Sequence, residues 1–106
     1  MLEINKDNYE TEVAQSAMPV VVDFWGPQCG PCLALMPEVE KLAAELDGKV
    51  KVCKVNIADG NRRLCINLKV MSVPTFLFVK GGEILDRLSG EEVNIEAIKA
   101  KANALL

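Results

Sequence analysis

Two cysteines, Cys29 and Cys32, are separated by two residues, a spacing at which thiols can form a reversible dithiol/disulfide couple. Residues 19–25 before them are β-branched and aromatic and predict a strand, whereas residues 33–46 carry apolar side chains at helical spacing. At the start of a helix, free backbone N–H groups and the positive end of the helix dipole favour a thiolate at Cys29. Cys32 lies on the same helical face, near enough for a disulfide if the Cα atoms are about 4.4 to 6.8 Å apart.

The absence of histidine and the positions of the other two cysteines restrict the reactions that the chain can catalyse. The chain contains no histidine, which excludes Cys–His and Ser–His–Asp catalysis and removes the commonest nitrogen ligand for metals. The two other cysteines, Cys53 and Cys65, fall in a predicted strand and a short predicted helix, which favours buried core thiols. The alternative is a metal site that all four cysteines share, although Cys53 and Cys65 are not a close ligand pair. No metal is therefore expected.

Length and charge predict a single globular domain spanning residues 1–106. The chain is 50% hydrophobic and 25% charged, typical of one hydrophobic core. Its 12 basic residues are scattered and are outnumbered by 15 acidic ones, giving a net charge of −3, so neither nucleic acid nor an anionic membrane surface is expected as a partner. Residues 1–10 lack a basic region followed by an apolar run, and no apolar stretch is long enough to span a bilayer. A cytoplasmic protein is the resulting expectation.

The remaining pattern predicts the order βαβαβαββα. Asp7 followed by Glu10 resembles a capping box for a helix that runs to about Ala17, and Gly81-Gly82 is typical of a tight hairpin. Pro37 should bend the helix that contains it. The other expected elements are strands at 2–5, 20–25, 50–57, 73–79 and 83–88, and helices at 31–47, 61–68 and 95–105, the last behind an Asn94 cap. Early strands joined through helices imply parallel pairing and the final hairpin antiparallel pairing, so we expect a mixed sheet with helices on both faces.

These features together resemble the thioredoxin family over nearly the full length of the chain. The resemblance rests on residues that occur in the family's order and approximate spacing: Val22-Asp23-Phe24-Trp25, Cys29-Gly30-Pro31-Cys32, Pro37, Lys54, Val73-Pro74-Thr75, Gly81 and Gly90. A C-x-x-C motif beside a βαβ pattern is itself typical of thioredoxin-like redox proteins. The resemblance implies an α/β thioredoxin fold, with a central mixed sheet of about five strands.

The same resemblance implies roles for individual residues. Cys29 would be the attacking, partly exposed thiol and Cys32 the buried, resolving one. A cis peptide bond before Pro74 would bring the Val73 backbone beside the cysteines, where it can pair with an extended substrate. The implied substrate-binding residues are Trp25, Gly30, Pro31, Val73, Pro74 and Gly90.

The implied activity is that of a protein-disulfide reductase, a thiol–disulfide oxidoreductase that carries electrons to disulfide-containing target proteins. Asp23 is the best candidate for the base that deprotonates Cys32, because its place in an apolar strand predicts desolvation that raises its proton affinity, which Lys54 would oppose. The sequence has no glycine fingerprint for nicotinamide or flavin. We therefore expect no cofactor besides the Cys29–Cys32 disulfide, a separate thioredoxin reductase as electron donor, and a monomer. The alternatives are a disulfide oxidase or isomerase, and a binding subunit that does not need redox turnover.

The chain departs from the family pattern around the implied docking surface. Gln28 stands where typical members carry a second tryptophan, Leu33 where a basic residue is usual, and Met71-Ser72 where many members have an arginine–glycine pair. These changes leave the exchange chemistry intact and predict an altered range of partners.

Overall fold

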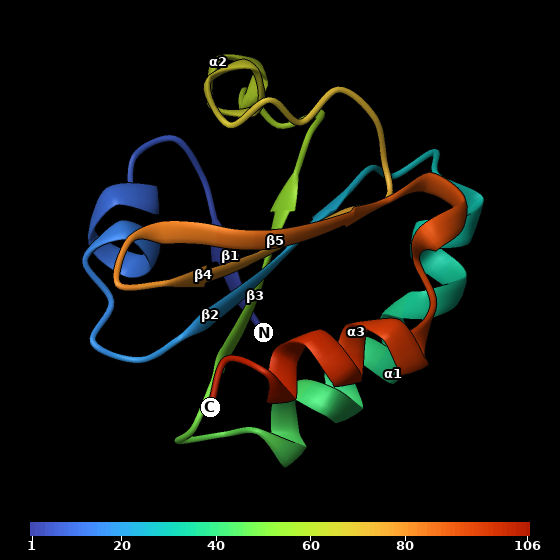
Figure 1. The fold of residues 1–106 in the computed structure, drawn as a ribbon. Helices are drawn as coiled ribbons and strands as arrows, with labels where there is room; N and C mark the ends of the chain where they lie inside the picture. Colours follow the sequence, from blue (N-terminus) through green and yellow to red (C-terminus); the bar gives the residue numbers. More distant parts are fainter.

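The computed structural model describes residues 1–106 as a five-stranded mixed sheet flanked by helices (Figure 1). Its strands are β1 (Leu2–Ile4), β2 (Val20–Trp25), β3 (Lys51–Asn56), β4 (Thr75–Lys80) and β5 (Glu83–Ser89). Its helices are the π-helix η1 (Glu10–Ala14), α1 (Gly30–Glu45), α2 (Arg62–Asn67), the 3₁₀ turn η2 (Gly90–Glu92) and α3 (Ile95–Asn103). The predicted order of elements and the mixed sheet are confirmed. None of the helices combines the length and the apolar character that a membrane-spanning segment requires.

The strands lie in the order β1-β3-β2-β4-β5, and the direction of β4 differs from the simple expectation for a strand that follows a helix. β1 and β2 both run parallel to β3, whereas β4 is antiparallel to β2 and β5 is antiparallel to β4. The register explains why. Asn56 at the end of β3 pairs with Trp25, and Thr75 at the start of β4 pairs with the adjacent Phe24. The connection through α2 therefore stays at one end of the sheet, and β4 has to run back.

The same register brings four strand ends together at one end of the sheet. β2 and β3 end there, β4 begins there, and Ser89 at the end of β5 pairs with Thr75. In Figure 1 the start of α1, the start of β4 and the end of β5 meet on the right-hand side. Loops that leave neighbouring strand ends lie side by side. At this end of the sheet, residues from distant parts of the sequence can therefore form one site.

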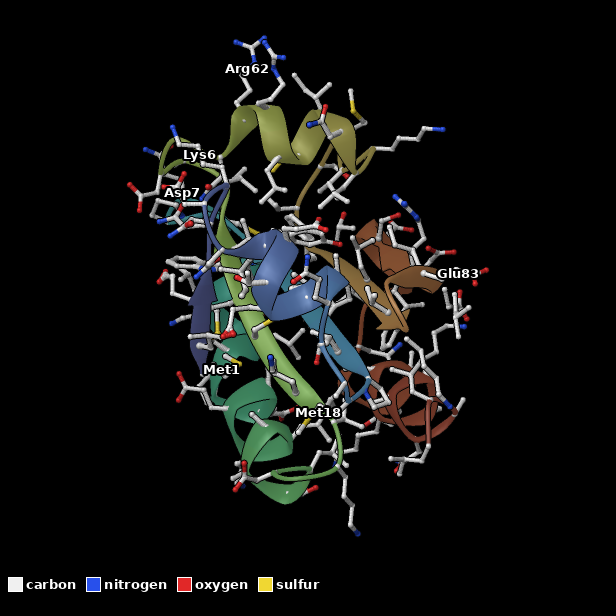
Figure 2. The ribbon with its side chains drawn as sticks, turned by 90° about the vertical axis from the view of Figure 1, so that its left-hand side faces the viewer. Met1, Lys6, Asp7, Met18, Arg62 and Glu83 are labelled. Carbon is white, nitrogen blue, oxygen red and sulfur yellow. A yellow bond between two sulfur atoms is a disulfide. The ribbon has the colours of Figure 1, made fainter.

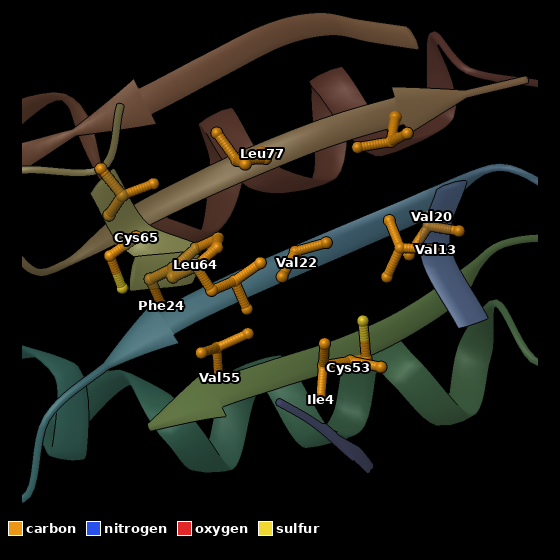
Figure 3. Packing of buried hydrophobic residues seen from close by; sticks show 12 residues of the cluster. Ile4, Val13, Val20, Val22, Phe24, Cys53, Val55, Leu64, Cys65 and Leu77 are labelled. Atoms are coloured by element: carbon orange, nitrogen blue, oxygen red, sulfur yellow. The ribbon is translucent and has the colours of Figure 1, made fainter. Parts of the chain in front are cut away.

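Two apolar cores hold helices against opposite faces of the sheet. One core joins Val13 of η1 and Leu64 of α2 to the even-numbered residues of β2, as Figure 3 shows. The other joins Val39 of α1 and Ile98 of α3 to Val21 of β2. This division follows from the pleat, since successive side chains of a strand point to opposite faces. The predicted helices on both faces are confirmed.

The N-terminal helix differs from its prediction. It is a short π-helix, Glu10–Ala14, rather than an α-helix that runs to Ala17, and Asp7 does not cap it. Asn5 stabilises the turn before the helix, because its side-chain oxygen accepts the N–H groups of Asp7 (2.8 Å) and Asn8 (3.1 Å). The neighbouring Lys6 N–H donates to Asn61 Oδ1 (3.0 Å), which ties this turn to the start of α2 (Figure 2). The tie is a long-range contact that local spacing could not reveal.

The C-terminal elements follow the prediction closely. The Gly81-Gly82 turn joins β4 to β5, and a Cβ at Gly82 would lie 2.7 Å from the carbonyl oxygen of Ala14, so no larger residue fits. Asn94 caps α3, with its side-chain oxygen accepting the N–H of Ala97 at 2.8 Å. Helix α1 is continuous through Pro37, so the expectation that the helix does not end there is confirmed.

Candidate active site

Cys29 and Cys32 form a disulfide at the N-terminus of α1, with a Cα–Cα separation of 5.3 Å. Cys29 is the N-cap residue and has an extended backbone, and its sulfur accepts the N–H of Cys32 at 3.2 Å. Cys29 is half-buried, whereas Cys32 is only 3% exposed. The predicted position at the mouth of the helix is therefore confirmed, and the two sulfurs are unequal in access.

A hollow of about 600 Å³ surrounds Cys29 on one side, and we call it the neutral hollow because none of its residues is charged. Its lining comes from the β2–α1 loop, the first residues of α1, the β3–α2 loop and the loop before β4: Gly26, Pro27, Gln28, Cys29, Gly30, Pro31, Ile57, Ala58 and Val73. The peptide bond between Val73 and Pro74 is cis. Val73 thus lines the same space as the reactive cysteine, beside Gly30 and Pro31.

A second concave region, of about 750 Å³, lies on the other side of the motif between α1 and α3, and we call it the α1–α3 groove. Pro31 lines this groove as well as the neutral hollow, and Pro74 and Gly90 line it too. The implied substrate-binding residues therefore divide between two adjoining hollows, apart from Trp25, which lines neither.

Asp23 lies on the face of the sheet that α1 covers. Its strand neighbours Val22 and Phe24 point into the core beneath η1 and α2, so the pleat directs Asp23 to the other side. The side chain is 3% exposed. Burial raises the pKa of Asp23 to about 7, and the charge of Lys54 opposes that rise. The carboxylate belongs to neither of the two ion pairs in the structure, so its desolvation is only partly compensated.

Lys54 faces the same side of the sheet as Asp23, because the two are direct partners in the β2–β3 register. Its ammonium group lies 5.7 Å from the centroid of the Trp25 ring, within the range of a cation–π contact. The Trp25 indole N–H is buried and has no hydrogen-bond partner. The structure thus brings Asp23, Trp25 and Lys54 together on the face of the sheet that α1 covers.

Cys53 and Cys65 lie apart from the disulfide. Both belong to the core beneath η1 and α2, on the face of the sheet opposite α1, and Figure 3 shows them well apart within that core. Cys53 donates to the carbonyl oxygen of Val21 (3.5 Å), and burial raises the pKa of its thiol to about 12. A metal site shared by all four cysteines is incompatible with this arrangement.

Sequence reasoning did not identify Ile57 and Ala58, which line the neutral hollow although they follow β3 and not the motif strand. The signal that could have identified these two residues is the order and direction of the predicted strands. If residues 20–25 and 50–57 form neighbouring parallel strands, the residues that follow each strand leave the same edge of the sheet.

Comparison with known proteins agrees with this geometry. Residues 1–104 match the family model described as Thioredoxin. The chain belongs to the thioredoxin family. It is 39% identical over 104 residues to a thioredoxin of Peptoclostridium acidaminophilum, an alignment covering 95% of this chain and 94% of the relative. It is 40% identical over 85 residues to a thioredoxin of Haemophilus influenzae, covering 80% and 78%. Thioredoxin 1 of Nostoc sp. is 39% identical over 88 residues, covering 83% and 81%.

Membership of the thioredoxin family, together with the Cys29–Cys32 disulfide, makes this chain a thiol–disulfide oxidoreductase that acts as a protein-disulfide reductase. Its redox-active group is that disulfide. The thioredoxin family implies two general kinds of partner, which are proteins that contain disulfides and a thioredoxin reductase.

Proposed function

We propose that the chain reduces target disulfides in two steps, with Cys29 as the attacking thiol and Cys32 as the resolving thiol. The observation that carries this assignment is the inequality of the two sulfurs at the N-terminus of α1. Cys29 is half-buried and its sulfur accepts a backbone N–H, whereas Cys32 is 3% exposed. A sulfur that is accessible and stabilised as an anion is suited to attack an external disulfide, and a buried one to react within the protein.

In the first step the Cys29 thiolate attacks one sulfur of the target disulfide. A bond forms between Cys29 and that sulfur, the target's own S–S bond breaks, and its other sulfur leaves as a thiolate that takes a proton from water. The product is a mixed disulfide between Cys29 and the target. The backbone N–H groups at the start of α1 stabilise the attacking anion before this step.

In the second step Cys32 loses its proton to the Asp23 carboxylate and attacks Cys29. The Cys29–Cys32 disulfide forms, the mixed disulfide breaks, and the second target sulfur leaves and is protonated. Two electrons have then passed from the protein to the target. A pKa of about 7 suits Asp23 to this role, because a base is most effective when its pKa lies near the working pH. Lys54 keeps that pKa from rising further.

The target segment is proposed to lie extended across the edge where Val73 meets Cys29, and to pair with the Val73 backbone. Gly30 and Pro31 are exposed and offer a surface with little side-chain bulk, Pro74 is buried beside Val73, and the exposed Gly90 allows close approach at the groove. Trp25 supports this surface from beneath through its contact with Lys54.

The working context of the protein is also a proposal. Residues 1–106 are proposed to act as one domain and as a monomer, in the cytoplasm, where disulfides are reduced continuously. A separate thioredoxin reductase would regenerate the dithiol after each cycle, so that the Cys29–Cys32 pair needs no further cofactor.

The experiment that tests the two-step assignment is trapping with Cys32→Ser. This variant should accumulate mixed disulfides with target proteins through Cys29, since no second thiol is available to release them. The species are measured as high-mass bands that disappear on reduction, and the trapped targets are identified by mass spectrometry.

Two matched variants control the trapping experiment. Cys29→Ser should form no mixed disulfide and show no turnover, and Cys65→Ser should behave as the parent protein. A Cys32→Ser protein that traps nothing, or a Cys29→Ser protein that still traps targets, would contradict the assignment.

A further prediction concerns partner recognition at Gln28, which lines the neutral hollow beside Cys29. Gln28→Trp should increase the rate of reduction by a conventional thioredoxin reductase about threefold, because an aromatic ring adds apolar contact area next to the reactive sulfur. The rate is measured by coupled nicotinamide oxidation, with Gln15→Trp, an exposed position on another element, as the control. An unchanged rate would remove Gln28 as a determinant of partner choice.

A further inference from the structure

The α1–α3 groove has an apolar floor and an acidic rim. Pro31, Leu35, Pro74, Val93 and Ile95 contribute apolar surface to it. All of its charged residues are glutamates, namely Glu38 of α1, Glu91 of η2 and Glu96 of α3. The groove is therefore an apolar trough edged by negative charge.

The groove is continuous with the reactive site. Pro31, next to Gly30 in the motif, lines both the groove and the neutral hollow that contains Cys29. Pro74, directly after Val73, lines the groove from the other side of the cis peptide bond. A target segment whose cysteine reaches Cys29 and whose backbone lies along Val73 will therefore extend into the groove on one flank.

The three rim glutamates are available for an external partner. All three are exposed, and neither of the two ion pairs in the structure includes any of them. The adjacent Glu92 is already used, because its side chain accepts the N–H of Ser89 in a capping box. Glu38 and Glu96 also line a separate hollow together with Lys41, Glu45, Ile95 and Lys99, but neither lysine lines the groove or forms an ion pair with them.

The two flanks of the reactive site differ in charge. The neutral hollow contains no charged residue, whereas the groove carries three carboxylates and no cation. Negative charge on one flank only will attract a positively charged target residue on that flank and will have little effect on the other.

We propose that the α1–α3 groove is a docking surface for a basic flank of the target, so that the enzyme favours disulfides whose attacked cysteine has Lys or Arg nearby on one side. The inference rests on the proposed two-step function, since it assigns a substrate preference to that same site. The apolar floor receives the aliphatic stems of Lys or Arg, and Glu38, Glu91 and Glu96 receive their charged ends.

The test uses symmetric disulfide dimers of short extended peptides with one cysteine each. One peptide has alanines on both sides, one has two lysines before the cysteine, and one has two lysines after it. Single-turnover reduction by the pre-reduced protein is followed by quenched chromatography. Each rate is divided by the rate with dithiothreitol, a neutral thiol, which removes the intrinsic effect of lysine on disulfide reactivity.

One of the two lysine peptides should react about tenfold faster than the alanine peptide at low ionic strength, and the other within about twofold of it. At about 1 M salt the advantage should fall below about twofold. The Glu38→Gln/Glu91→Gln/Glu96→Gln variant should lose most of the advantage, and Glu91→Gln alone should lose part of it. Glu83→Gln, an exposed glutamate at the β4–β5 hairpin, should retain the parent ratio (Figure 2).

The outcomes separate the two levels of the proposal. If the alanine peptide is not reduced by the parent protein, the two-step function itself is wrong. If it is reduced but both lysine peptides gain equally, or neither gains, the docking assignment is wrong while the function stands. An advantage that the triple glutamine variant keeps in full would also overturn the docking assignment.

Discussion

Asp23→Asn should slow the release of reduced target about a hundredfold at pH 7, while changing the rate of the first attack by less than about threefold. The reason is that the two steps draw on different groups. The first step uses the Cys29 anion, which backbone N–H groups at the start of α1 stabilise. The second step requires a proton to leave the buried Cys32, and Asp23 is the only carboxylate buried on that face of the sheet.

The pH dependence gives this prediction a second readout. A base accepts a proton only in its ionised form, so the release rate of the parent protein should rise with pH and level off above about 7, the pKa of Asp23. The variant should lack this inflection. Rapid quenching with acid, followed by mass spectrometry of the mixed disulfide, separates attack from release.

Asp47→Asn is the matched control for the kinetic measurement, because Asp47 is an exposed carboxylate beyond the end of α1. It should leave both steps unchanged. Equal slowing of attack and release in Asp23→Asn, or an inflection near pH 7 that persists in the variant, would remove Asp23 from the role of base.

The positions of the cysteines and of Asp23 could largely be predicted from the sequence, because they depend on residues that are close together in the chain. Only Gly30 and Pro31 separate Cys29 from Cys32, and a strand-to-helix pattern around them is enough to place both at a helix N-terminus, which the structure confirms. The burial of Asp23 followed from the apolar strand that surrounds it. These features depend on contacts within one strand and one helix, which are the contacts that residue patterns report most directly.

Features that depend on contacts between distant parts of the chain could not be predicted from the sequence in the same way. Ile57 and Ala58 reach the neutral hollow only because β2 and β3 end at the same edge of the sheet. The direction of β4 depends on where the α2 connection runs, which residue spacing does not encode. Glu91 belongs to no motif in the sequence, and η2 is what places it on the rim of the groove.

The buried position that suits Asp23 to proton transfer should also lower the stability of the protein. In the unfolded chain this carboxyl has a pKa near 3.8, and burial raises it to about 7 in the folded protein. Between these values the folded protein holds a proton that the unfolded chain has released, so the free energy of unfolding should fall as pH rises from about 4 to about 7. Above both values the penalty is fully present and amounts to about 4 kcal/mol.

Asp23→Asn should therefore increase the free energy of unfolding by about 3 to 4 kcal/mol at pH 8 and by less than about 1 kcal/mol at pH 4, because asparagine is neutral at both. Denaturant titrations of the disulfide form at the two pH values measure the difference. Asp86→Asn is a control of opposite sign: a hydrogen bond from Lys101 lowers the pKa of Asp86, so this exposed carboxylate favours the folded state above its unfolded pKa. If the stabilisation by Asp23→Asn is the same at pH 4 and pH 8, the gain comes from packing or hydrogen bonding, and the desolvated carboxylate is not its cause.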